Sequence, residues 1–174
     1  MKRIMLIGAG GAGKSTLALK LAEITQLPLT HLDKVYWQSN WQEPDKKWWK
    51  EKVEELASKE SWILDGNYGG TMDIRLAKAD TVIFMDYPSY IKVLRVLKRY
   101  WQNRKKSRPD MPEDCPEKID WPFILYIANY NKSRKPGIMK KLANLRSDQQ
   151  AIILKNDKET RQFIQSLSQT YATS

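Results

Sequence analysis

Short apolar runs alternate along the chain with longer stretches in which apolar residues recur every three or four positions. The short runs indicate buried strands, and they lie at residues 3–7, 29–32, 62–64, 81–85 and 151–154. The longer periodic stretches predict helices, and they span about residues 14–25, 45–59, 74–78, 89–105, 121–132, 136–145 and 158–167. Strands that alternate with helices favour a parallel sheet covered on both faces. We therefore predict a single α/β domain over residues 1–174.

The first predicted strand and helix are joined by residues 8–16, GAGGAGKST. This stretch satisfies G-x-x-x-x-G-K-[ST] in the strand-to-helix context that phosphate binding requires. Its glycines let successive backbone N–H groups point at phosphate oxygens, and the helix adds the positive end of its dipole. Lys14 is expected to reach the β- and γ-phosphates, and Ser15 to offer its hydroxyl to Mg²⁺. The predicted nucleotide-binding residues are Gly8, Gly11, Ala12, Gly13, Lys14, Ser15 and Thr16.

The excess of basic residues is concentrated in the middle of the chain. Residues 87–146 hold 15 Lys or Arg but only 5 Asp or Glu, an excess equal to the whole net charge of +10. A concentrated positive field attracts polyanions, which are either nucleotides or nucleic acid. Four lysines of this segment are interpreted as a solvated helix face; they are Lys92, Lys98, Lys105 and Lys106.

The overall composition is that of an ordinary globular protein, with 41% apolar and 29% charged residues. No apolar run approaches the length of a membrane span. The single cysteine, Cys115, cannot form an intrachain disulfide or a cysteine metal cluster. We therefore expect a cytoplasmic protein that does not act at a membrane.

A bound triphosphate can be sensed by a switch, hydrolysed by a motor or transferred to a second molecule. A GTP switch would carry Asn-Lys-x-Asp, and the Lys-Asn-Asp at residues 155–157 does not fit that pattern. A motor ATPase would place two consecutive acids after an apolar strand. The single acids that follow predicted strands, Asp33, Asp65 and Asp86, each precede a residue that is not acidic. What remains is a phosphotransferase that brings a second substrate to the γ-phosphate.

Several stretches resemble the adenylate-kinase-type P-loop kinases: GAGGAGKST, the Asp65-Gly66 turn, and MDYP at residues 85–88 followed by Arg95 and Arg99. Four more are similar to the bacterial DNA topology modulation proteins of the FlaR type within that group: LPLTHLDKVYW, WILDGNYGGTMDIRL, ADTVIFMDYP and RPDMPEDCPEK. The resemblance covers nearly the whole chain. It implies a P-loop fold with a five-stranded parallel sheet in the order 2-3-1-4-5. It also implies an acceptor-covering segment at about residues 34–60 and a lid over the phosphates at about residues 104–118.

The resemblance further implies roles for individual side chains. Asp65 would help to hold Mg²⁺ through water, and Arg95 would stack on the adenine ring. Arg99 matches the first phosphate-contacting arginine of the lid, and Arg108 and Arg134 match further lid arginines less closely. Such arginines donate bidentate hydrogen bonds to the phosphoryl oxygens and help to exclude water.

The acceptor side departs from the family pattern. Family members follow the Asp-Gly turn with a proline–arginine pair that grips the acceptor, whereas this chain has Asn-Tyr-Gly-Gly at residues 67–70. The next arginine is Arg75, so an ordinary nucleoside monophosphate is not the expected acceptor. Asp65, Tyr68 and Arg75 are themselves predicted to contact the acceptor.

Asp33, Trp37 and Trp41 are further candidates for acceptor binding. Asp33 could orient a hydroxyl nucleophile and accept its proton, hold a Mg²⁺-bound water, or cap the turn that follows. Trp37 and Trp41 lie in a polar part of the acceptor-covering segment and could form a wall against a base or a sugar. His31, the only histidine, is interpreted as structural.

Two functions are consistent with these observations. The first is an ATP- and Mg²⁺-dependent phosphotransferase whose acceptor is a nucleotide, a nucleoside or a hydroxylated metabolite. The second is an ATP-regulated nucleic-acid-binding protein, in which the basic segment and its interspersed aromatic residues would track a phosphate backbone. No nucleic-acid-reading module is visible, and the basic segment coincides with the lid of the kinase group. We therefore favour the phosphotransferase, although the residues do not identify its acceptor.

Overall fold

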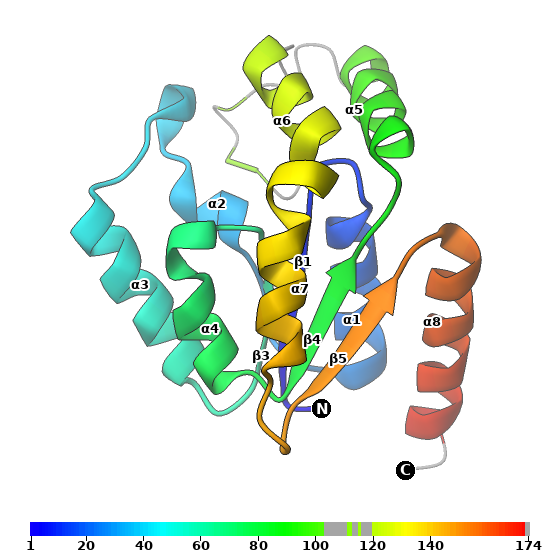
Figure 1. Ribbon diagram of the computed structural model, residues 1–174. Coiled ribbons are helices and arrows are strands. Elements are labelled where there is room, and N and C mark those ends of the chain that lie inside the picture. Colours follow the sequence, from blue (N-terminus) through cyan, green and yellow to red (C-terminus); the bar gives the residue numbers. More distant parts are fainter. Residues whose placement is uncertain (103–110, 113–114, 116–119, 173–174) are drawn as a thin grey trace.

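The computed structural model describes residues 1–102, 111–112, 115 and 120–172. Its strands form one sheet in which every pairing is parallel, in the order β2-β3-β1-β4-β5 (Figure 1). The strands are β1 (Arg3–Gly8), β2 (Leu29–His31), β3 (Trp62–Asp65), β4 (Thr81–Met85) and β5 (Gln150–Leu154). The α/β class and the strand order predicted from the sequence are thereby confirmed.

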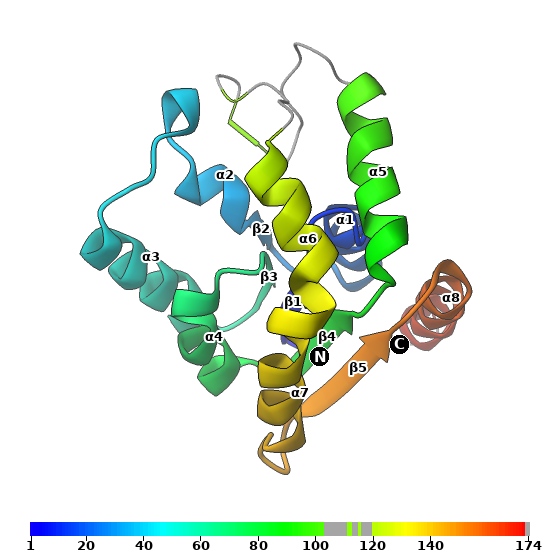
Figure 2. The ribbon, with the colours of Figure 1, turned by 45° about the horizontal axis from the view of Figure 1, so that its top comes forward.

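Helices cover both faces of this sheet. They are α1 (Lys14–Thr25), α2 (Leu32–Tyr36), α3 (Lys46–Ser58), α4 (Met72–Lys78), α5 (Ser89–Gln102), α6 (Trp121–Ser133), α7 (Lys135–Ala143) and α8 (Asp157–Ala172). α1 and α8 pack on one face, and α3, α4 and α7 cover the other (Figure 1). α5 and α6 stand side by side beyond the carboxyl ends of the strands, as the turned view in Figure 2 also shows.

Two apolar cores lie on either side of the sheet, because successive residues of a strand point to opposite faces. On β1, Met5 and Ile7 belong to the core that includes α3 and α7, whereas Ile4 and Leu6 belong to the core that includes α1 and α8. All four side chains are at most 1% exposed. Burial on both faces explains why the central strands read as continuous apolar runs rather than as alternating patterns.

The structure corrects the sequence prediction at the second strand. A strand was expected over residues 29–32, but β2 ends at His31 and Leu32 begins the five-residue helix α2. A helix this short makes little more than one turn, so its periodicity is too brief to recognise. Asp33 therefore lies in the first turn of α2 rather than directly after a strand. At the other end of the chain, α8 extends to Ala172, beyond its predicted end.

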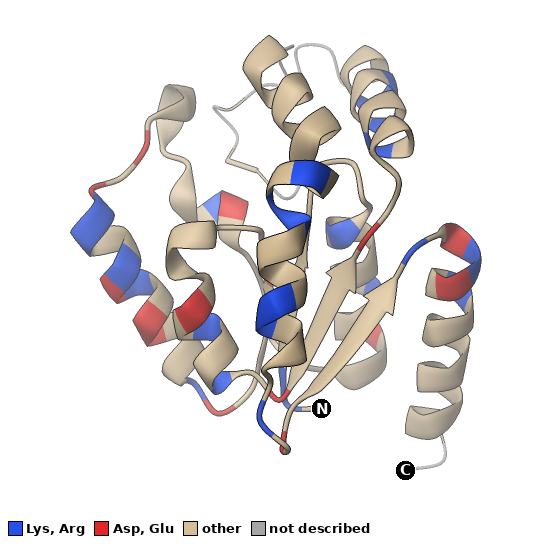
Figure 3. Ribbon diagram, in the orientation of Figure 1, with Lys and Arg blue, Asp and Glu red and all other residues tan. Residues whose placement is uncertain are grey.

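Basic residues lie on α5 and around the junction of α6 and α7 (Figure 3). Residues 121–131 of α6, by contrast, carry no lysine or arginine. The predicted lid at about residues 104–118, with Arg108, lies almost entirely outside the described residues. Within the described ranges, no helix combines the length and the apolar character needed to cross a membrane.

Candidate active site

The phosphate-binding loop predicted from the sequence lies between β1 and α1. Gly11 and Gly13 have positive φ angles of 77° and 94°, and Gly13 is the N-cap residue of α1. A Cβ atom on Gly11 would lie 2.3 Å from the Lys92 carbonyl oxygen of α5, so a side chain has no room there. Positive φ and close backbone approach are the two conditions that only glycine meets without strain. A glycine turn at a helix N-terminus is a ready anion-binding site.

Lys14, Ser15 and Thr16 follow this loop in the first turn of α1. The Lys14 ammonium group donates a hydrogen bond to the Ala9 carbonyl oxygen at 3.1 Å, so the side chain folds back over the loop. The predicted contact of Lys14 with the β- and γ-phosphates stays a prediction.

A pocket of about 320 Å³ beside the loop contains Arg95. Gly13 and Thr16 line it together with Tyr87 and Asp157. The Arg95 guanidinium lies 4.9 Å from the centre of the Tyr87 ring and donates hydrogen bonds of 2.8 and 2.7 Å to the two Asp157 carboxylate oxygens. The bond from Arg95 and, less strongly, that from Tyr87 lower the pKa of Asp157. Asp157 and Tyr87, which sequence reasoning missed, thus hold the Arg95 guanidinium group next to the phosphate loop.

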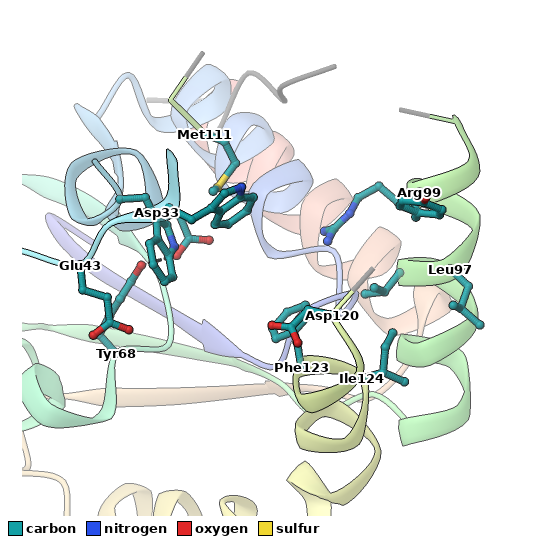
Figure 4. Close-up of a pocket in the computed structure, with 13 residues that line it drawn as sticks. Asp33, Glu43, Tyr68, Leu97, Arg99, Met111, Asp120, Phe123 and Ile124 are labelled. Carbon is teal, nitrogen blue, oxygen red and sulfur yellow. Dashed lines mark hydrogen bonds between the residues drawn. The ribbon is translucent and has the colours of Figure 1, made fainter. Parts of the chain in front are cut away.

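A second pocket, of about 350 Å³, lies between α2, α5 and α6, and we call it the aromatic pocket (Figure 4). Five residues predicted as active-site residues from separate parts of the sequence line it together: Asp33, Trp37, Trp41, Tyr68 and Arg99. Figure 4 shows Asp33 and Arg99 pointing into it from opposite sides. The sequence analysis did not single out Glu43, Asp120 or Phe123, which also line it.

The aromatic pocket adjoins the phosphate loop. Phe123 and Val96 line the pocket. A Cβ atom on Gly10 would lie 2.6 Å from the Phe123 ring, and one on Gly11 would lie 3.0 Å from a Val96 methyl group. The same two side chains therefore contact the loop and wall the pocket.

Tyr68 orients Asp33. Its hydroxyl donates a 2.7 Å hydrogen bond to an Asp33 carboxylate oxygen. Burial, and then the charge and hydrogen bond of Asp33, raise the pKa of Tyr68 well above its usual range, so the hydroxyl keeps its proton. The Tyr68 ring is held in turn by Tyr36 and Trp49, at centroid distances of 4.6 and 4.9 Å. Asp33 is thus placed by a packed aromatic cluster.

Asp65, at the end of β3, fits the predicted role beside a metal. It is 4% exposed, and His31 Nδ1 lies 2.8 Å from its Oδ2 atom. Its Oδ1 atom is buried without a hydrogen-bond partner among the described residues. A buried carboxylate oxygen needs a donor, and water bound to Mg²⁺ would supply one. Asp65 is thus the partner of His31, a contact that the sequence did not reveal.

Arg75 and Arg134 lie away from the aromatic pocket. Arg75 is fully buried and donates 2.7 Å hydrogen bonds to the carbonyl oxygens of Gly66 and Tyr68, and burial lowers its pKa to about 10. Arg75 therefore supports the loop that carries Tyr68. The prediction that Arg75 contacts the acceptor directly is not matched by this buried position. Arg134, at the α6–α7 junction, lines a separate pocket of about 400 Å³ together with Lys141.

Lys92 is a buried cation that the sequence analysis misread as solvated. Its ammonium group donates a 2.7 Å hydrogen bond to Asn131 of α6 and lies 4.8 Å from the centre of the Tyr130 ring. Burial above all, and then the charges of Lys135 and Lys14, lower its pKa to about 8, while Asp86 acts in the opposite direction. Lys92 lies four residues before the buried Val96, on the same face of α5, and this spacing could have predicted its burial.

Comparisons with known proteins identify the fold. No protein-family model matches the chain. No curated protein matches it either. The structure is similar to the shikimate kinase of Acinetobacter baumannii in complex with shikimate, at 18% identity over 99% of this chain and 94% of that one (TM-score 0.60). It is also similar to a gluconokinase from Sinorhizobium meliloti 1021, at 14% identity over 99% and 92% of the two chains (TM-score 0.54).

A shikimate kinase from Bacteroides thetaiotaomicron is similar at 18% identity, over 98% of each chain (TM-score 0.59). The chain therefore has the fold of the small-molecule P-loop kinases. None of these matches supports the more specific resemblance to DNA topology modulation proteins, or the alternative of a nucleic-acid-binding protein.

Proposed function

We propose that this protein is an ATP- and Mg²⁺-dependent phosphotransferase that moves the γ-phosphoryl group to a hydroxyl of a small molecule held in the aromatic pocket. One observation carries the proposal: Asp33 and Arg99 face each other across a pocket whose walls contact the phosphate loop. A nucleophile-orienting acid and a phosphate-binding arginine are two groups that recur in such transfers. The likeness to kinases of small molecules supports the same conclusion.

The nucleotide would extend from the phosphate loop to Arg95 of α5. We assign the adenine to the Arg95 pocket, where the guanidinium group held by Asp157 offers a stacking surface. We assign the phosphates to the loop, with Lys14 at the β- and γ-phosphates. Ser15 and Asp65 would hold Mg²⁺, directly and through water respectively, and the ion would neutralise charge on the phosphates.

The acceptor reacts from the aromatic pocket. Asp33, held by Tyr68, orients the acceptor hydroxyl and takes its proton as the hydroxyl oxygen bonds to the γ-phosphorus. The bond between that phosphorus and the β,γ-bridging oxygen breaks, and its electrons leave with ADP. Lys14 and Arg99 stabilise the negative charge that spreads over the phosphoryl oxygens. The aromatic walls keep out water, which would otherwise accept the phosphoryl group.

A transfer assay with γ-labelled ATP tests this function over nucleosides, sugars and other hydroxylated metabolites. Lys14→Ala and Arg99→Ala are expected to lower turnover about 100-fold or more, because each removes charge from the transferring group. Lys98→Ala is the matched control, since Lys98 is exposed on the same helix next to Arg99 and should retain wild-type turnover. Slow hydrolysis without transfer to any compound, combined with salt-sensitive DNA binding, would contradict the proposal.

A further inference from the structure

Carboxylates gather in the aromatic pocket although the protein as a whole is basic. Of the described residues that line the pocket, three are acids and one is basic: Asp33, Glu43, Asp120 and Arg99. The whole chain, in contrast, has a net charge of +10. The acids come from α2, from the segment before α3 and from the N-cap position of α6. Three separate elements therefore bring acids to the described part of this pocket's lining.

Glu43 and Asp120 do not serve the helices beside them. The Asp120 side chain makes no capping hydrogen bond to α6, and Figure 4 shows it at the pocket beside Phe123. Asp45, rather than Glu43, caps α3. Glu43 shares a hydrogen bond with Tyr36, whose pKa is raised by burial and then by Glu43. Both acids are exposed residues of the pocket lining, and neither caps its neighbouring helix.

The other walls favour the same kind of ligand. Trp37 and Trp41 pack edge to face with centroids 5.4 Å apart, and both line the pocket with Phe123. The face of an aromatic ring carries partial negative charge and attracts cations. Rings and carboxylates together therefore favour a bound cation and disfavour a bound anion. The pocket volume of about 350 Å³ is sufficient for one ring-sized molecule.

We infer that the acceptor is a hydroxyl compound that carries a protonated amine, such as an amino sugar or a cyclic amino alcohol, rather than a carboxylic acid or a phosphate ester. This inference rests on the function proposed above. The hydroxyl lies at Asp33, the ring against Trp37 and Trp41, and the ammonium group between Glu43 and Asp120. Arg99 remains directed at the phosphoryl group. The acceptor thus binds with a charge opposite to that of the triphosphate beside it.

Three probes with one ring and different charges test the inference directly. Benzylamine, benzyl alcohol and benzoate are titrated at pH 7 against the full chain with Mg²⁺ and a non-hydrolysable ATP analogue, and binding is followed by ligand-observed NMR. Benzylamine is expected to bind roughly tenfold more tightly than benzoate, with benzyl alcohol between them. Glu43→Gln should reduce that ratio several-fold. Glu51→Gln, an exposed acid on α3, is the matched control and should leave the ratio unchanged.

Two results would overturn the inference: benzoate binding as tightly as benzylamine, or no measurable binding of benzylamine to the wild-type protein. The transfer assay separates this outcome from a failure of the proposed function, when it is run with glucosamine, glucose and glucuronate. Transfer to glucuronate in preference to glucosamine would overturn the amine inference and leave the phosphotransferase intact. Transfer to no acceptor of any charge, with the NMR order as expected, would overturn the phosphotransferase and leave the pocket selective for cations.

Discussion

At the scale of single residues, the hydrogen bond from Tyr68 to Asp33 can be removed by a conservative change. The aromatic cluster around Tyr68 holds its ring, so removing the hydroxyl alone leaves the packing in place. Tyr68→Phe is expected to lower kcat about tenfold, since Asp33 loses the donor that orients it, and to cost about 1 kcal/mol of stability. Steady-state kinetics and thermal unfolding measure the two effects. Tyr90→Phe, at an exposed tyrosine on α5, is the control and should change neither kcat nor stability. An unchanged kcat in Tyr68→Phe would show that Tyr68 does not orient Asp33 for the reaction.

Lys92 gives a pH-dependent prediction. Its pKa is lowered from 10.5 to about 8 in the folded protein, so between these values the unfolded chain binds more protons. The free energy of unfolding therefore rises with pH in that window, because deprotonation relieves the cost of a buried charge. Asp86, Lys135 and Lys14 are the charged groups that act on Lys92.

Lys92→Met lacks this titration and keeps every other ionisable group. We expect the melting temperature of the wild-type protein to rise relative to that of Lys92→Met as the pH increases from 7 to 10. Thermal unfolding of both proteins at several pH values measures the difference. A difference that stays constant with pH would show that Lys92 is not a desolvated cation.

At the scale of elements, α5 is a support for the phosphate loop. Gly11 has a φ angle of 77°, and a Cβ atom there would lie 2.3 Å from the backbone of α5 at Lys92. Gly11→Ala should therefore destabilise the fold by about 1–3 kcal/mol and weaken ATP binding, because the loop or α5 must shift. Gly137→Ala is the control, since nothing lies within 4 Å of a Cβ atom there and alanine favours the helix α7. Chemical unfolding and ATP titration compare the two variants, and equal stability in both would contradict the support by α5.

The sequence predicts the buried strands and the phosphate loop well, but not the short helix α2 or the buried cations. Continuous apolar runs locate β1, β3 and β4 because these strands are buried on both faces. The loop pattern identifies the phosphate site because its spacing reflects backbone geometry. Helix α2 escaped prediction because one turn shows no periodicity. Lys92 and Arg75 were misassigned because a sequence does not show which cation of a helix faces inward until the packing partner is known.

At the scale of the whole molecule, charge is divided between two adjoining sites. The basic excess of residues 87–146 reaches the pocket beside the phosphate loop through Arg95, whereas the described lining of the aromatic pocket holds three acids and Arg99. Five residues predicted to act at the active site meet in that pocket, because the carboxyl ends of parallel strands bring distant segments to one edge. The acidic lining itself was not predicted, since Glu43 and Asp120 lie in irregular parts of the sequence with no motif around them.

The most direct test of the phosphoryl transfer follows the label from γ-labelled ATP and asks which molecule carries it at the end. With an accepted substrate present, we predict that the label appears in an organic phosphate ester. Asp33→Asn should abolish ester formation while ATP still binds, and Asp73→Asn, at an exposed acid of α4, should leave it unchanged. If all of the label were recovered as inorganic phosphate, in the wild-type protein and in both variants alike, the chain would be a hydrolase or a nucleotide-binding protein and not a phosphotransferase.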